Sequence, residues 1–260
     1  RLLKARLTLA EVFLACLLGY ASHGLLDACT SYGTQLFWPF SDVRIAWNWI
    51  SVVDPLFTVP LLILVLCGVA RRRRAYGLAA LAWVLIYLTL GVVQQQRALR
   101  GVEALAAERG HAPARIMVKP GFANLLIWKS VYESEGRYYV DGIRVGRVAG
   151  ICPGDTIQAL DTRRDYPWLD ASSQQALDLD RFRWYSNGWL AIDAENPLYV
   201  VAVRDASLPN RIAPLWGLRL DPSAERGSHA VWHVVRSRRS ADLDQLLGLI
   251  AGQGCRLPAG

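Results

Sequence analysis

Three long apolar runs in the first third of the chain constrain its fold more than any other feature. They extend over residues 7–26, 55–70 and 75–93; Glu11 and His23 interrupt the first, and the other two contain no charged residue. A helix that spans a bilayer needs about 20 apolar residues, within a range of roughly 17 to 25. The pattern therefore predicts about three membrane helices and a lipid bilayer as partner.

The positions of the basic residues predict an orientation for these helices. Lys and Arg gather before the first run and between the second and third, at Arg1, Lys4, Arg6 and Arg71–Arg74. Such residues accumulate in the cytoplasmic loops of membrane proteins. We therefore expect a multi-pass protein of the bacterial inner (cytoplasmic) membrane, with residues 27–54 in an outer loop and everything after Val93 on the outer side.

Composition differs between the two parts of the chain. Residues 1–93 contain 8 Lys and Arg against 4 Asp and Glu, and residues 94–260 contain 21 against 18. With 53% hydrophobic residues overall, a disordered chain is excluded. The mixed charge after residue 93 includes no basic stripe, so we expect no nucleic-acid partner.

The second part has the pattern of a soluble domain. A polar helix is expected over residues 94–110, followed by a mostly antiparallel β domain over 111–260 that ends in a helix over 240–251. Asp141-Gly142 and Asn187-Gly188 are predicted hairpin turns. The predicted fold is thus an α-helical membrane domain (1–93) followed by a mostly antiparallel β, or α+β, extracytoplasmic domain.

His23 and Asp27 are the first candidates for chemistry. Four residues apart on a helix, their side chains emerge on one face, one turn apart. Imidazole and carboxylate at this spacing can hold a divalent metal such as Zn, Mn or Mg. The alternative is a structural polar pair at the membrane–water boundary. The polar residues that follow, Thr30, Thr34 and Gln35 among them, favour a functional site.

Asp54 has two compatible interpretations. As the residue before Pro55, it is a typical N-cap, with proline at the first helical position. As a third carboxylate near the outer surface, it can also approach His23 and Asp27.

Residues 22–62 carry a resemblance to a known family. Their sequence, SHGLLDACTSYGTQLFWPFSDVRIAWNWISVVDPLFTVPLL, resembles the signature of bacterial membrane-bound, metal-dependent hydrolases of the YdjM type, LexA-regulated inner-membrane proteins. The similarity extends through QQQRA, VKPGFANLLIW and RFRWYSNGW. It implies that His23 and Asp27 are metal ligands, that Asp27 and Asp54 are catalytic carboxylates, with Asp54 also a possible ligand, and that Thr30, Thr34 and Gln35 shape the site.

The resemblance also implies further ligands. Family members usually begin with another membrane segment that bears an Asp-rich motif and a His-Arg-Gly-x-Thr-His-Ser motif. The present sequence starts at Arg1 without these motifs. We therefore expect it to contain part of a metal site and to be a fragment of a longer polypeptide or a truncated gene product.

Other histidines and the cysteines add less. His229 and His233 also lie four residues apart, but in a predicted strand this spacing separates them by roughly 13 Å, too far to share one ion. Cys152 and Cys255 would lie in an oxidising compartment, where a disulfide between them and two free thiols both remain open.

The first hypothesis is a membrane-bound, divalent-metal-dependent hydrolase that acts on a phosphoester of the lipid-borne kind at the outer membrane surface. The substrate class comes by analogy, because His-x-x-x-Asp ligation is similar to that of zinc phospholipases C. The alternative is a non-enzymatic membrane anchor that displays a periplasmic binding domain. A transporter is a third, weaker hypothesis, since three spans are too few without oligomerisation. The sequence leaves the oligomeric state open.

Overall fold

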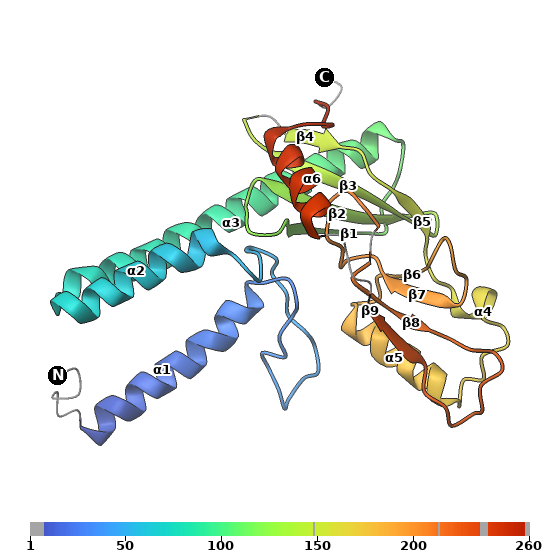
Figure 1. The fold of residues 1–260 in the computed structure, drawn as a ribbon, viewed down its shortest axis with the longest axis horizontal. Helices are drawn as coiled ribbons and strands as arrows, with labels where there is room; N and C mark the ends of the chain where they lie inside the picture. Colours follow the sequence, from blue (N-terminus) through green and yellow to red (C-terminus); the bar gives the residue numbers. More distant parts are fainter. Residues whose placement is uncertain (1–7, 148, 213, 235–238, 258–260) are drawn as a thin grey trace. The chain divides into compact units, whose positions relative to one another are not determined.

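The chain forms two compact units. A computed structural model describes residues 8–147, 149–212, 214–234 and 239–257 (Figure 1). Its contacts group the residues up to Val93 with Phe122–Asn124 as one unit, and Gln94–Gly121 with Leu125–Gly260 as the other. Each unit is described separately below.

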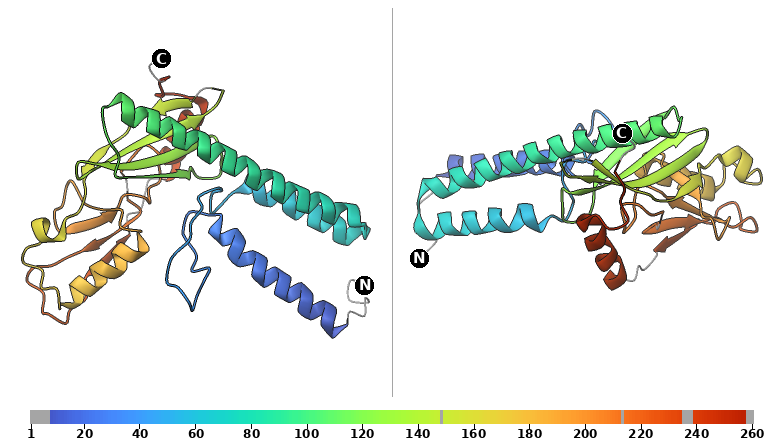
Figure 2. Two further views of the ribbon diagram at one scale, coloured as in Figure 1. Left: turned by 180° about the vertical axis from the view of Figure 1, so that it is seen from behind. Right: turned by 90° about the horizontal axis from the view of Figure 1, so that it is seen from above.

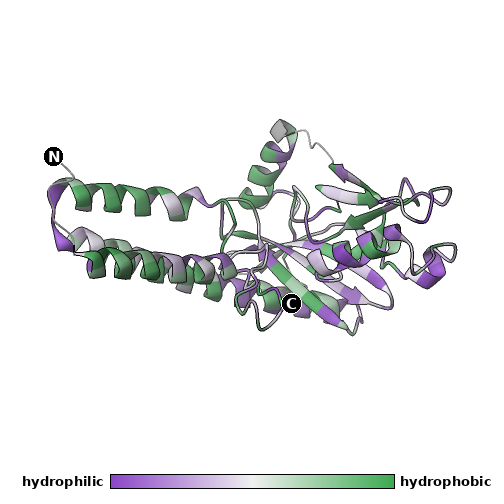
Figure 3. Ribbon diagram, turned by 90° about the horizontal axis from the view of Figure 1, so that it is seen from below, coloured by the Kyte–Doolittle hydropathy of each residue, from purple (hydrophilic) through white to green (hydrophobic). Residues whose placement is uncertain are grey.

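The apolar runs of the first unit form helices. They are α1 (Leu9–Ala28), α2 (Pro55–Arg71) and α3 (Arg74–Glu108), the last of which continues into the second unit. Figure 3 shows hydrophobic residues along these helices. By length and hydropathy, α1 and α3 are candidate membrane spans, whereas α2 is a shorter apolar helix of 17 residues. The structure thus gives two candidate spans, and the predicted number of about three is not confirmed.

Two acidic residues near the apolar runs, Glu11 and Asp54, cap the starts of helices. Thr8 and Glu11 form a capping box, in which the Glu11 carboxylate accepts from the Thr8 N–H at 2.8 Å. Glu11 is therefore part of the N-terminal cap of α1. Asp54 is the N-cap of α2, with Pro55 at the first position, as the sequence predicts. At the other end of α2, Arg72 has a positive φ of 51°.

The segment between α1 and α2 is bound to the end of α1. The Trp47 N–H donates to the Ala28 carbonyl at 2.7 Å, and the Trp49 N–H donates to the Cys29 carbonyl at 2.8 Å. The same segment contacts α3 at Gly91, where an added Cβ would lie 2.4 Å from the Trp49 carbonyl oxygen. Glycine at this position is required for such a close approach.

The second unit begins with an antiparallel sheet. Its strands are β1 (Arg115–Pro120), β2 (Ile127–Ser134), β3 (Arg137–Val145), β4 (Ala149–Cys152) and β5 (Thr156–Gln158). The order is β1-β2-β3-β4, with β5 also paired to β3. The second half of α3 lies along this sheet (Figure 2). Gly101 faces Ile143 there, and Val102 and Leu105 are fully buried.

The predicted hairpin at Asp141-Gly142 is wrong. Both residues lie inside β3, opposite Ser130 and Lys129 of β2. The turn that joins β2 to β3 is at Glu135 and Gly136, which both have positive φ values, 52° and 70°, as a two-residue hairpin requires. Gly142 instead serves packing, because an added Cβ would lie 3.2 Å from the Cβ of Cys152.

A second antiparallel sheet follows. Two helices precede it, α4 (Thr162–Asp165) and α5 (Gln174–Tyr185), and its strands, in order, are β6 (Leu190–Ile192), β7 (Tyr199–Ala202), β8 (Trp216–Arg219) and β9 (Val231–Val234). Leu179 and Phe182 of α5 pack on Val200 and Leu218 of the sheet. Asn187-Gly188 is not a hairpin turn, because it ends α5: the Gly188 N–H donates to the Arg183 carbonyl.

The last elements close the second unit. Helix α6 (Arg239–Ala251) confirms the predicted C-terminal helix, and its Leu246 and Leu249 pack with Ile127 of β2. Cys152 at the end of β4 and Cys255 after α6 form a disulfide. The structure therefore confirms the broad fold, a helical N-terminal region followed by antiparallel sheets.

Candidate functional site

The structure brings His23 and Asp27 together near the end of α1. His23 Nε2 lies 3.4 Å from Asp27 Oδ2, as expected for residues one turn apart. Their side chains are 73% and 48% exposed in the described chain. Both groups are therefore accessible in the described chain, and one nitrogen and one carboxylate oxygen face each other.

The three polar residues predicted to shape the site lie in the segment that follows. The Thr30 hydroxyl donates to the Asp27 carbonyl at 2.7 Å and so helps to end the helix. Thr34 pairs with Ile45 through two backbone hydrogen bonds of 2.9 Å, and the Gln35 carbonyl accepts from the Trp38 N–H. These residues hold the segment beside the pair through their backbone and hydroxyl groups.

Asp54 is held by other partners. Its Oδ1 accepts from the Phe57 N–H at 3.3 Å, and its Oδ2 accepts from the Tyr87 hydroxyl at 2.8 Å. Only 4% of Asp54 is exposed. Both carboxylate oxygens thus serve the cap of α2 and its contact with α3, and the catalytic or ligand role of Asp54 stays a prediction.

The fit of a metal to this region is partial. Across the described ranges, no group of three or more His, Cys, Asp and Glu side chains is placed to hold a metal ion. His23 and Asp27 supply two donors of a type that divalent ions accept. Any further ligand would have to be water, substrate or a group outside this pair.

The comparison with known families addresses this part of the chain. Residues 2–98 match the YdjM inner membrane protein family. The resemblance seen in the sequence is therefore confirmed over that range, hereafter the YdjM region. The matching family is described as an inner membrane protein, and α1 and α3 of this chain are candidate membrane spans. No curated protein and no solved structure matches the chain.

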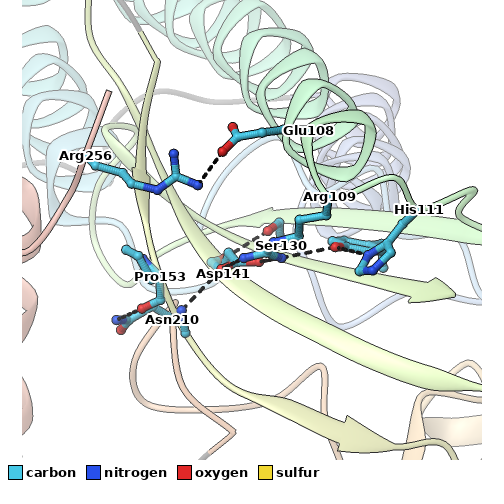
Figure 4. Close-up of polar contacts among 10 residues, drawn as sticks. Glu108, Arg109, His111, Ser130, Asp141, Pro153, Asn210 and Arg256 are labelled. Carbon is cyan, nitrogen blue, oxygen red and sulfur yellow. Dashed lines mark hydrogen bonds and ion pairs between the residues drawn. The ribbon is translucent and has the colours of Figure 1, made fainter. Parts of the chain in front are cut away.

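Outside the YdjM region, a polar network joins the end of α3 to the first sheet (Figure 4). Arg109 donates to Asp141 through two hydrogen bonds, of 2.6 and 2.9 Å, and to the Tyr132 hydroxyl at 3.0 Å. His111 Nδ1 lies 2.9 Å from the same hydroxyl. Asp141 is only 1% exposed, so its charge is neutralised by Arg109 in a largely dehydrated setting.

A second buried cluster contains two lysines. Lys119 and Lys129 face each other across β1 and β2. Lys119 Nζ donates to Asp205 at 2.9 Å, and Lys129 Nζ donates to the Arg211 carbonyl at 2.8 Å. Burial, and then the charge of Lys119, lowers the pKa of Lys129 to about 7. Burial also lowers the pKa of Lys119, although Asp205 acts in the opposite direction. Both opposed lysines therefore bind a proton less readily than a lysine in water.

A third cluster pairs α5 with the residues before β9. His229 Nδ1 lies 2.9 Å from Asp178 Oδ2. His229 precedes the strand and His233 lies within it, where its ring contacts Tyr199. Sequence reasoning missed this cluster because Asp178 and His229 are 51 residues apart, and the spacing of His229 and His233 does not point to Asp178.

Proposed function

We propose that this protein is a membrane-bound, divalent-metal-dependent hydrolase in which His23 and Asp27 provide two metal ligands. The observation that carries the proposal is their contact on one face of α1, where a nitrogen and a carboxylate oxygen are 3.4 Å apart and both side chains are accessible. The match of residues 2–98 to the YdjM family supports this choice of region. Zn, Mn and Mg are the candidate ions.

The substrate proposed is a phosphoester, in the first instance a lipid-borne one. A divalent ion supplies Lewis acidity and lowers the pKa of water bound to it. His23 and Asp27 would hold the ion. Thr30 supports the turn beneath Asp27, and Asp54 keeps α2 in place through its cap. A site at the end of a lipid-facing helix favours substrates that reside in the membrane.

We propose a multi-pass topology with the C-terminal unit on the outer side. The support is twofold: Arg71–Arg74 lie at the junction of α2 and α3, and Cys152 and Cys255 form a disulfide. Disulfides persist in oxidising compartments. A reporter fused after residue 100 tests this orientation, and a cytoplasmic signal would contradict it.

The test of the hydrolase uses the purified full chain in detergent. Metal content is measured by mass spectrometry, and phosphodiester and phosphomonoester lipids are assayed with added Zn²⁺, Mn²⁺ or Mg²⁺. We expect metal binding and turnover to fall in His23→Ala and Asp27→Asn. Ser22→Ala is the matched control, because the Ser22 hydroxyl bonds only within α1, to the Gly19 carbonyl, among the contacts described. Equal metal binding in all four proteins would contradict the assignment.

A second candidate is a membrane anchor that displays an extracytoplasmic binding domain. The disulfide-linked second unit, with a hollow between α5 and the second sheet, favours it. In this case His23 and Asp27 form a structural pair. Stoichiometric metal that is lost in His23→Ala supports the hydrolase, whereas a metal-free wild type with an intact fold supports the anchor.

A further inference from the structure

A hollow of about 440 Å³ opens between α5 and the second sheet. This volume lies in the range of small-molecule sites, about 300 to 1,000 Å³. Its lining combines apolar and aromatic side chains with three polar or charged ones, Asp178, Arg181 and His229. Residues from α5, β8 and the start of β9 line it, among them Asp178, Phe182, Tyr185, Leu218, His229 and Trp232.

Asp178 positions the histidine at the rim through a hydrogen bond to its Nδ1. Its Oδ2 accepts from the Ala230 N–H at 3.0 Å and contacts His229 Nδ1 at 2.9 Å, while its Oδ1 accepts from Gln174 at 3.0 Å. Burial acts to raise the pKa of Asp178, but these hydrogen bonds outweigh it and the pKa is lowered. An ionised carboxylate can only accept, so His229 donates through Nδ1. In the neutral ring, Nε2 is then a hydrogen-bond acceptor.

Trp232 contributes a half-exposed aromatic ring to the lining. Phe182 meets this ring at an interplanar angle of 85°, with 5.5 Å between the centroids, and Trp216 is stacked with it at 6.4 Å. These two contacts restrict the orientation of the ring, so its exposed part can meet a ligand without a large loss of side-chain freedom. The exposed part of an aromatic ring attracts the C–H groups of a flat, apolar ring surface.

Arg181 adds a cation at the same rim. Its Nη1 lies 3.4 Å from Asp178 Oδ1, and its side chain is 74% exposed. A guanidinium has five N–H donors, and one contact with Asp178 leaves donors for a ligand. Carboxylates and phosphates are the groups with which a guanidinium forms the strongest paired hydrogen bonds.

We propose that this hollow binds an acidic saccharide. A sugar ring presents C–H groups to Trp232, a hydroxyl donor to His229 Nε2, and a carboxylate substituent to Arg181. One ligand class thus satisfies the aromatic face, the acceptor and the cation together. The proposal uses only the second unit and does not depend on metal binding by His23 and Asp27.

The experiment is calorimetric titration of the purified full chain in detergent. The probes are tri-galacturonic acid, the neutral maltotriose and adenosine monophosphate. We expect the acidic trisaccharide to bind more tightly than the neutral one. Arg181→Gln should lower the affinity for the acidic trisaccharide by about tenfold, because it removes a hydrogen bond between charged groups. The same variant should change the affinity for the neutral trisaccharide by less than about twofold. Trp232→Leu should lower the affinity for both trisaccharides.

The control is Arg137→Gln, which removes the same charge from an exposed residue at the start of β3. It should leave both affinities unchanged. Because Arg181 is also exposed, its replacement tests the proposal even if Trp232→Leu fails to fold. Three results would overturn the proposal: no binding of either trisaccharide at millimolar concentration, equal binding of both that Arg181→Gln leaves unchanged, or tighter binding of the nucleotide.

Discussion

Arg109 and Asp141 form an ion pair with two hydrogen bonds: Nη1 donates to Oδ2 at 2.6 Å, and Nη2 donates to Oδ1 at 2.9 Å. The Asp141 side chain is 2% exposed, and that of Arg109 is 28% exposed. The Gly154 N–H also donates to Asp141, at 3.2 Å. A single buried carboxylate therefore links the residue after α3, the middle of β3 and the segment after β4.

Loss of one partner of this pair should destabilise the second unit strongly. Arg109→Met leaves the buried carboxylate without its cation, and we expect a loss of about 3 to 5 kcal/mol in the free energy of unfolding. The double variant Arg109→Met/Asp141→Leu should lose less. Urea unfolding, followed by tryptophan fluorescence, measures both values.

The matched control is the exposed pair Arg256–Glu108, at 2.8 Å. Arg256→Gln should cost less than about 1 kcal/mol, because water screens exposed pairs. The single variant Asp141→Leu completes the cycle. If the double variant loses the sum of the free energies lost in Arg109→Met and Asp141→Leu, the pair is not coupled.

Substitutions of Asp54 separate its structural role from a role in metal binding. Asp54→Ala removes the cap of α2 and leaves the Tyr87 hydroxyl without its acceptor, so we expect a loss of about 1 to 2 kcal/mol. Asp54→Asn retains one oxygen to cap the Phe57 N–H, and its amide nitrogen can donate to the Tyr87 hydroxyl oxygen, so it should lose less stability than Asp54→Ala. If Asp54→Asn nonetheless loses metal affinity in a competition assay, Asp54 acts as more than a cap. Equal thermal stability of the Ala and Asn variants would contradict the capping role.

The disulfide between Cys152 and Cys255 should contribute substantially to stability. The two residues are 103 positions apart, and a closed loop of about 100 residues restricts the unfolded chain by about 4 to 5 kcal/mol in the chain-entropy estimate. The Cys152→Ser/Cys255→Ser variant should melt at a lower temperature than the oxidised protein. Thiol titration of the denatured, unreduced chain should find three free thiols, those of Cys16, Cys29 and Cys67. Five thiols would contradict the bond.

Lys129 should make stability depend on pH. Its pKa is lowered to about 7 in the folded chain, whereas an unfolded lysine titrates near 10.4. Between these values the unfolded state binds more protons, so the stability of the wild type should rise from about pH 7 toward pH 10. Lys129→Met removes this titration. The difference in melting temperature between wild type and Lys129→Met should therefore shift in favour of the wild type as pH increases, and a pH-independent difference would contradict the lowered pKa.

The sequence predicts those features that depend on neighbours along the chain. The apolar runs indicate α1, α2 and α3, the cap at Asp54 follows from Asp-Pro, and the spacing of His23 and Asp27 fixes their contact on a helix. Each of these depends on one helix or one turn. The spacing of apolar residues also predicts the C-terminal helix, α6.

Features that depend on distant contacts were not predictable in the same way. Asp141-Gly142 has the local pattern of a hairpin turn, yet packing against Cys152 and the pair with Arg109 place it inside β3. The dyad of Asp178 and His229 joins two segments that no local pattern connects. The contact of His23 with Asp27 follows from one helix turn, whereas a complete metal site would need further ligands from segments that no local pattern connects to this turn.

The contact between Gly91 and the Trp49 carbonyl makes one position unusually intolerant of change. An added methyl group at residue 91 would lie 2.4 Å from that oxygen, which is a backbone atom and cannot turn aside. The segment would have to move, and with it the hydrogen bonds from Trp47 and Trp49 that hold the end of α1. In a saturation library at this position, glycine alone should preserve the placement of His23 and Asp27.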